Sequence, residues 1–357
     1  MKKKIIFIAA HRFNRSPSQR YRFEQYFSFL NENGFDCQLA NIISAADDKI
    51  FYSQGNWLKK ILLLLKFFLK RCWHVIQSLQ YDYIFIQREA FFIGPPMFEY
   101  LFKLTGKKII FDLDDAIWLP NVSEGNKQFA KLKFPAKTAA IMRLSSRIVA
   151  GNIYLKAYAS QFNHDIVIIP STIDLNYYKI IQQPISNIVT IGWSGSATTI
   201  QHLKTLENVF EKLKEKLGDK INFIVYGDEN FENKNLKIKG IKWTSESEVE
   251  VLNRFDIGVM PLPDNEWTRG KCAMKALQYM ALAKPVVVSP VGVNKDIVME
   301  GVNGFLAATD EEWLLKLEQL INDAALRKSI GEAGKITIEK DFSVAANGKK
   351  YVAVFDF

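Results

Sequence analysis

Residues 267–292 read WTRGKCAMKALQYMALAKPVVVSPVG, and this stretch carries the strongest signal for the fold of the chain. Its pattern predicts a loop, a helix that begins at Gly270, a buried strand over Lys284–Ser289 and a tight turn. The strand is a continuous apolar run, which is typical of a parallel sheet covered on both faces. The stretch therefore predicts an open α/β sheet.

Positive charge gathers at the start of the predicted helix. Lys271 and Lys275 stand four residues apart, and Arg269 lies just before them. Lysines at this spacing are usually a solvated helix face. Cations at a helix N-terminus, however, oppose the helix dipole unless an anion is shared between them, and open α/β sheets bind ligands at such places. We therefore predict a phosphate or diphosphate site here.

The same stretch resembles the donor-binding signature of family 4 glycosyltransferases, which are two-domain enzymes of the GT-B fold. The residues that carry the resemblance are Gln278–Val287, Val291–Val298 and Gly301–Leu306. Gly270 and Gln278 occupy the positions of the two glutamates that members of the family share. We interpret the chain as a divergent branch in which ammonium groups hold the diphosphate.

Length, charge and cysteine content limit the possibilities. With 357 residues, the chain predicts two domains, and its 48% hydrophobic and 24% charged residues are typical of a folded protein. The net charge of +9 favours anionic partners, but no motif for nucleic-acid binding is present. Three dispersed cysteines and the absence of a bilayer-length apolar run lead us to expect a cytoplasmic protein.

Short apolar runs alternate with amphipathic segments along most of the chain. This pattern predicts α/β architecture, with two tandem Rossmann-like domains whose parallel sheets face a central cleft, as in the GT-B fold. We expect an acceptor-side domain over 1–172, a linker over 173–187 and a nucleotide-sugar-binding domain over 188–338. The resemblance implies that a helix over 339–357 crosses back to the first domain.

Further donor contacts are expected at the ends of strands in the second domain. Ser194 and Gly195 follow a predicted strand over Ile188–Trp193, and they offer backbone N–H groups to phosphate. Gln278 is expected at the nucleotide ribose. The predicted donor-binding residues are Ser194, Gly195, Arg269, Gly270, Lys271, Gln278, Val291 and Gly292.

The loop after the first strand reads HRFNRSPSQRYR (residues 11–22) and is rich in arginine. Rossmann-type folds bind phosphates at this place, and the planar guanidinium group suits phosphate oxygens. A basic solvated loop explains the pattern about equally well. We assign Arg20 and Arg22 to contact with the acceptor or the diphosphate.

Three acids stand at the carboxyl end of an apolar strand, in Phe111-Asp112-Leu113-Asp114-Asp115. Their mutual repulsion is costly unless cations or substrate hydroxyls share the site. By the resemblance, Asp114 and Asp115 lie beside the reacting sugar, and Asp114 positions or deprotonates the acceptor hydroxyl. The alternative is a role in capping or loop structure. The predicted catalytic residues are Asp114, Asp115 and Lys275.

Residues 57–73 read WLKKILLLLKFFLKRCW. If helical, this segment places on one polar arc the cations Lys59, Lys60, Lys66, Lys70 and Arg71, with apolar residues over the rest. Such a pattern is typical of a helix that lies on an anionic membrane surface, and a helix packed on its own domain is an equal alternative.

Together these features predict a glycosyltransferase that moves a sugar from a UDP- or GDP-linked donor to a glycan or lipid-linked acceptor. The resemblance implies retention of anomeric configuration and no required metal, and we expect no cofactor. The alternatives are a nucleotide-sugar epimerase and a non-catalytic glycan-binding subunit.

Overall fold

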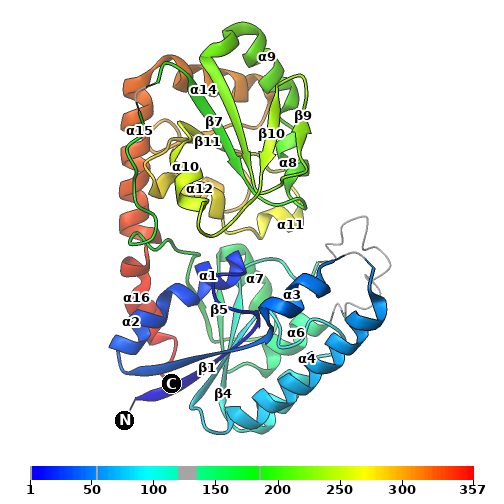
Figure 1. The fold of residues 1–357 in the computed structure, drawn as a ribbon. Helices are drawn as coiled ribbons and strands as arrows, with labels where there is room; N and C mark the ends of the chain where they lie inside the picture. Colours follow the sequence, from blue (N-terminus) through cyan, green and yellow to red (C-terminus); the bar gives the residue numbers. More distant parts are fainter. Residues whose placement is uncertain (1, 54, 120–133, 135, 185) are drawn as a thin grey trace. The chain divides into compact units, whose positions relative to one another are not determined.

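The computed structural model describes residues 2–53, 55–119, 134, 136–184 and 186–357. It contains two compact units: Met1–Ser171 together with Gly348–Phe357 form unit 1, and Thr172–Asn347 form unit 2. Each unit is built around its own sheet, with helices packed against it (Figure 1). The predicted fold class, two Rossmann-like α/β halves, is confirmed.

Unit 1 has a six-stranded sheet in the order β2-β1-β3-β4-β5-β6, and every pair in it is parallel. The strands are β1 (Lys3–His11), β2 (Phe35–Ile43), β3 (Tyr83–Gln87), β4 (Lys108–Leu113), β5 (Arg147–Ala150) and β6 (Ile166–Ile168). The helices are α1 (Pro17–Arg22), α2 (Phe27–Glu32), α3 (Ala45–Phe51), α4 (Trp57–Ser78), α5 (Met97–Leu104), α6 (Lys137–Leu144), α7 (Ile153–Ala159) and the end of α16 (Val344–Ala353).

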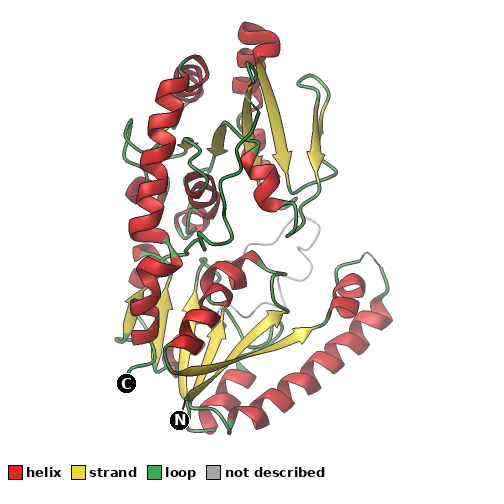
Figure 2. Cartoon of the chain, turned by 60° about the vertical axis from the view of Figure 1, so that its left-hand side comes forward, coloured by secondary structure: helices red, strands yellow, loops and turns green. Residues whose placement is uncertain are grey.

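Alternation along β1 and β2 divides the core of unit 1 between two faces of the sheet. Phe7 lies 4.9 Å from Phe85 between ring centroids, and Tyr351 of α16 packs on Phe85 and on Tyr26. In the strand register, Ile42 of β2 points to the opposite face of the sheet from Phe7. It belongs to one hydrophobic cluster with Phe67 of α4. Helices α16 and α4 therefore cover different faces of this sheet (Figures 1 and 2).

Unit 2 has a seven-stranded sheet in the order β13-β12-β11-β7-β8-β10-β9, parallel except for the β10–β9 pair. Its strands are β7 (Val189–Ser194), β8 (Ile221–Tyr226), β9 (Glu232–Asn233), β10 (Ile238–Ile241), β11 (Ile257–Met260), β12 (Val286–Val288) and β13 (Phe305–Leu306). Its helices are α8 (Ile200–Lys204), α9 (Glu207–Leu217), α10 (Glu248–Asn253), α11 (Glu266–Arg269), α12 (Met274–Ala281), α13 (Asn294–Ile297), α14 (Asp310–Asn322), α15 (Ala324–Thr337) and the start of α16.

Helix α12 lies unusually close to the sheet of unit 2 because glycine occupies the strand beneath it. A Cβ atom on Gly258 of β11 would lie 2.2 Å from the ring of Tyr279, which is a steric clash. Gly192 of β7 makes the same room for Phe255. Gly258 therefore allows α12 to pack closely on the sheet, and Gly192 does the same for Phe255.

A buried ion pair crosses the core of unit 1. Arg22 donates from Nη2 to Asp112 Oδ1 at 2.7 Å and from Nη1 to the carbonyl of Ile169 at 2.6 Å. The two side chains are 1% and 0% exposed. Because desolvating two charges is costly, the pair is favourable only while both partners are present and hydrogen-bonded.

Removing one partner is therefore expected to cost far more than removing both. Asp112→Ala strands a guanidinium group in the core and should destabilise unit 1 by about 3–5 kcal/mol in urea unfolding. The double variant Arg22→Met/Asp112→Leu should recover most of that loss. Asp165→Ala, which breaks the more exposed pair with Arg147, is the control and should cost about 1 kcal/mol or less. Equal losses of unfolding free energy in Asp112→Ala and Asp165→Ala would contradict this account.

Candidate functional site

The cationic stretch of unit 2 folds as two helices rather than one. Asn265 caps α11 through a capping box with Thr268, and α11 ends at Arg269. Ala273 then takes a left-handed conformation, with φ 53°, and α12 begins at Met274. The prediction that one helix begins at Gly270 is therefore wrong. Lys271 precedes α12, and Lys275 lies in its first turn.

The charges of the two lysines still reach the same groups near the end of β7. Lys275 Nζ lies 5.4 Å from the ring centroid of Trp193 in β7, and Lys271 Nζ lies 5.4 Å from that of Trp267. Burial, and then the charge of Lys271, lower the pKa of Lys275 to about 7. Burial and the same two lysines lower the pKa of His202 in α8 to about 4. The carboxyl end of β7 is thus strongly electropositive.

An electropositive place of this kind favours a dianionic ligand. Burial and Lys271 both oppose the charge of Lys275, so a phosphate beside it relieves the repulsion and restores the proton. The tryptophan faces hold the ammonium groups by cation–π attraction without neutralising them. The geometry therefore fits a phosphate or diphosphate group.

Hydrogen bonds to other elements of unit 2 hold the end of β7 and the turn that follows it. Ser194 N–H donates to Tyr279 Oη at 2.7 Å, and the two hydroxyls lie 2.8 Å apart. Gly195 N–H donates to the carbonyl of Tyr226. A Cβ on Gly227 would lie 1.7 Å from the Gly195 carbonyl oxygen, so this crossing requires glycine. Phosphate contact by the amides of Ser194 and Gly195 would have to displace these bonds, and it stays a prediction.

A second turn lies against the loop that carries Arg269. Gly292 follows Val291 after β12 and has φ 53°, and a Cβ atom on it would lie 2.7 Å from the carbonyl oxygen of Arg269. Arg269 Nε donates to Asp264 at 2.7 Å, and both side chains are about half exposed. The structure thus brings the predicted residues Arg269, Gly270, Val291 and Gly292 into one group of adjoining loops.

Gln278 belongs to a buried hydrogen-bond network that the sequence did not predict. Its Nε2 donates to Tyr178 Oη at 2.7 Å and to Glu248 Oε1 at 3.2 Å. Tyr178 Oη and Trp243 Nε1 also donate to Glu248, at 2.9 and 3.0 Å. Glu248 is 4% exposed, so three donors from three segments stabilise a buried carboxylate. A ribose contact by Gln278 would be fixed in direction by this network.

In unit 1, the acids at the end of β4 are neutralised by arginines. Arg88 follows β3 with φ 61° and donates to both oxygens of Asp114, at 2.6 and 3.0 Å. The same guanidinium lies 3.7 Å from Asp115, and Asp112 pairs with Arg22. Burial opposes charge on Arg88, but Asp114 and Asp115 raise its pKa overall. No group of three metal-ligating side chains occurs within the described residues.

The arginines of the β1–α1 loop and of α1 also contact other side chains within unit 1. Arg22 is 1% exposed in the core, so the prediction that it contacts a substrate is wrong. Arg20 is 8% exposed, its guanidinium lies 4.6 Å from the Tyr21 ring centroid, and its predicted contact with a substrate stays untested.

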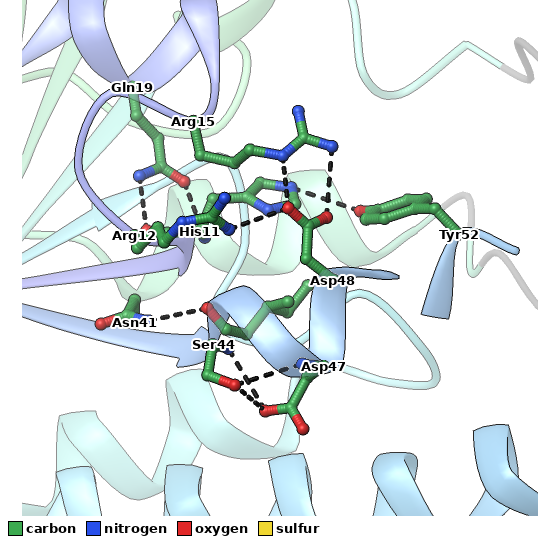
Figure 3. Close-up of polar contacts among 10 residues, drawn as sticks. His11, Arg12, Arg15, Gln19, Asn41, Ser44, Asp47, Asp48 and Tyr52 are labelled. Carbon is green, nitrogen blue, oxygen red and sulfur yellow. Dashed lines mark hydrogen bonds and ion pairs between the residues drawn. The ribbon is translucent and has the colours of Figure 1, made fainter. Parts of the chain in front are cut away.

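The arginines nearer the surface of this loop are Arg12 and Arg15, which both donate to Asp48 (Figure 3). The same figure shows Gln19 bonded to the backbone of His11 and Tyr52 beside the His11 ring. Tyr52 Oη lies 3.3 Å from His11 Nε2. Burial, and then Arg15, lower the pKa of His11 to about 4. The loop is therefore a well-braced element at the carboxyl edge of the sheet.

Sequence reasoning missed several residues of these sites. Arg88 had a readable signal, because it follows a parallel strand at the edge where Asp114 was expected. His202, Tyr178, Trp243 and Glu248 had none, because they come from segments far apart in the chain. Only the fold brings them together.

Residues 188–323, within unit 2, match the family model described as Glycosyl transferases group 1. A curated relative, the uncharacterized glycosyltransferase MJ1069 of Methanocaldococcus jannaschii, is 25% identical over 191 residues. That alignment covers 50% of this chain and 47% of the relative, so the chain spans about half the length of that protein. The match places a glycosyltransferase-type domain around the cationic site.

Solved structures share the fold over nearly the whole chain. Sucrose-phosphate synthase from Thermosynechococcus elongatus has a TM-score of 0.72 at 13% identity, covering 99% of this chain and 98% of its own. Anabaena Alr3699/HepE, solved in complex with UDP-glucose, has a TM-score of 0.66 at 14% identity, covering 98% of both chains. At these identities the likeness establishes the GT-B fold.

The network around Gln278 gives a physical reason for an amide, and not an acid, at this position. Gln278→Glu places a second carboxylate against Glu248 and removes a donor, so it should destabilise unit 2 by about 1–3 kcal/mol in urea unfolding at pH 7.5. Exchanging the two groups, in Gln278→Glu/Glu248→Gln, restores one carboxylate and one amide and should recover most of the loss. The network would be refuted if Gln278→Glu left the free energy of unfolding unchanged. It would also be refuted if the double variant lost as much stability as the two single variants together.

Proposed function

We propose that this chain is a glycosyltransferase that moves a sugar from a nucleotide-diphosphate donor to a hydroxyl of a glycan or a lipid-linked acceptor. The observation that carries the proposal is Lys275, held over Trp193 beside Lys271 at the carboxyl end of β7. This place lies inside the segment that matches the glycosyltransferase family model.

Unit 2 binds the donor in this proposal. Lys271, Lys275 and Arg269 stabilise the negative charge that develops on the departing diphosphate, an electrostatic contribution made by groups already in position. The loops at Gly270 and at Val291–Gly292 border the same place, and Gln278 contacts the ribose. UDP or GDP is the leaving nucleotide, and the UDP-glucose complex of the structurally similar HepE supports UDP as the first choice.

Unit 1 binds the acceptor. Asp114 and Asp115 lie at the carboxyl end of β4, where open α/β sheets bind ligands, and Arg88 fixes the orientation of both carboxylates. We propose that Asp114 positions or deprotonates the acceptor hydroxyl, with Arg88 holding the carboxylate in place through two hydrogen bonds. Transfer proceeds with retention of anomeric configuration and without a metal.

The proposed setting is the assembly of a cell-surface polysaccharide or glycolipid, at the inner face of the membrane. The net charge of +9 supports an anionic surface as a partner. Among the described helices, none combines the length and apolar character that a membrane-spanning segment needs. The proposal is therefore attachment to the surface of the membrane.

Lys275→Ala removes the cation nearest the proposed leaving group and should lower turnover of the preferred donor at least about tenfold, without loss of thermal stability. A thermal-shift screen of UDP, GDP and their sugars first identifies that donor, and release of nucleoside diphosphate then reports turnover. Lys216→Ala, which alters a lysine paired with Glu318 on the surface of unit 2, is the matched control.

Unchanged turnover in Lys275→Ala would overturn the assignment of this lysine. Isomerised nucleotide sugar without release of nucleoside diphosphate would indicate an epimerase instead. A wild-type chain that binds no nucleotide sugar in calorimetry would indicate a non-catalytic glycan-binding subunit.

A further inference from the structure

Helix α4 turns its most apolar side away from its own domain. The side chains of Leu58, Leu62, Leu65, Leu69, Trp73 and Ile76 repeat every three or four residues, and each is more than half exposed. Leu58 is 80% exposed. The spacing puts all six on one stripe along a helix of 22 residues, about 33 Å long. The exposure of these side chains shows that no described element covers them, and α4 lies on the outside of unit 1 (Figures 1 and 2).

The inward side of α4 carries polar residues instead. Arg71 is fully buried and donates to the carbonyls of Ala40 and Ala9, at 2.9 and 2.8 Å. His74 and Ser78 are buried on the same side, with Phe67. The sequence pattern predicted that Arg71 belongs to a polar arc at the surface, and this prediction is wrong. The fold buries an arginine and leaves leucines exposed, which is unfavourable unless something covers them.

Helix α5 packs against α4 and exposes apolar side chains of its own. Met97, Tyr100 and Leu104 are exposed on α5 at helical spacing. Isolated exposed apolar residues are ordinary on a protein surface, but two packed helices that each expose a series of apolar side chains are typical of a docking surface. We call these α4 and α5 residues the apolar face.

The exposed charged side chains of α4 and α5 are all positive. Helix α4 contains no Asp or Glu, and the one acid of α5, Glu99, is 1% exposed. Lys59, Lys66 and Lys103 are exposed on the two helices, and Lys66 pairs with Asp47 of α3. A second copy of this chain would bring a second set of cations against the first. Anionic lipid head groups would instead lie beside the lysines while the apolar side chains enter the acyl region.

We infer that the apolar face of α4 and α5 is a membrane-binding surface selective for anionic phospholipid, on which α4 lies parallel to the bilayer. This inference deepens the proposed function and rests on it only for the conclusion that the acceptor is lipid-linked. All of its residues belong to unit 1, whereas the proposed donor site belongs to unit 2.

The test is co-sedimentation of the full chain with vesicles of phosphatidylcholine alone or with about one third phosphatidylglycerol. We expect binding to the anionic vesicles only, weakened by added salt. Leu65→Glu/Leu69→Glu should reduce that binding about tenfold or more, because it places two carboxylates in the stripe. Leu315→Glu/Ile336→Glu, at equally exposed positions of unit 2, is the matched control and should bind like the wild type.

UDP affinity, measured on the same samples, separates the two proposals: it should be unchanged in both double variants. If Leu65→Glu/Leu69→Glu fails to fold by its melting curve, Lys59→Gln/Lys103→Gln replaces it and should weaken anionic binding. The inference is overturned if the wild type does not sediment with anionic vesicles, or if the stripe variant still does. It is also overturned if ultracentrifugation shows a dimer that the stripe variant dissociates, because the occupant is then a second copy.

Discussion

The account depends on one electrostatic constraint: Lys275 is buried over an indole ring with the charge of Lys271 close by. Both effects oppose a proton on Lys275, and both are relieved by an anion in the same place. The fold maintains this arrangement through the glycine of β11 that lets α12 approach, and through the left-handed Ala273 that ends the loop before it. The site is therefore prepared for a ligand that carries at least two negative charges.

The buried carboxylate of Glu248 gives a physical reason for an amide at position 278. An acid at position 278 would face Glu248 without a donor between them, whereas Gln278 supplies that donor at 3.2 Å. The amide at position 278 is thus matched to a carboxylate nearby in space. The linear sequence does not reveal this pairing, because Glu248 precedes Gln278 by a full strand and helix.

Much of the fold followed from apolar periodicity. The strand predicted over Ile188–Trp193 is β7 (Val189–Ser194), and the one predicted over Lys284–Ser289 contains β12 (Val286–Val288), because continuous apolar runs flanked by polar residues have few other ways to be buried. The helix start near Gly270 was wrong because a local capping box at Asn265 and the backbone of Ala273 divided the segment.

The errors in the sites have a different cause. Arg22 and Arg71 look like surface cations in the sequence, yet each is buried with acceptors that come from distant segments: Asp112 for the first, and the carbonyls of Ala9 and Ala40 for the second. Periodicity shows that a helix is amphipathic, but the partners available in three dimensions decide which side faces inward. For α4 that side is the more polar one.

The most direct test of the central claim is proton uptake on UDP binding, from calorimetry in buffers of different ionisation enthalpy. The pKa of Lys275 is about 7 in the free chain and rises when a diphosphate binds. Binding at pH 8 should therefore take up nearly one proton, binding at pH 6 almost none, and UDP affinity should fall as the pH rises above 7. Lys275→Arg should bind UDP without that uptake. Equal affinity for UDP and uridine, or no difference in uptake between pH 6 and pH 8, would contradict the account.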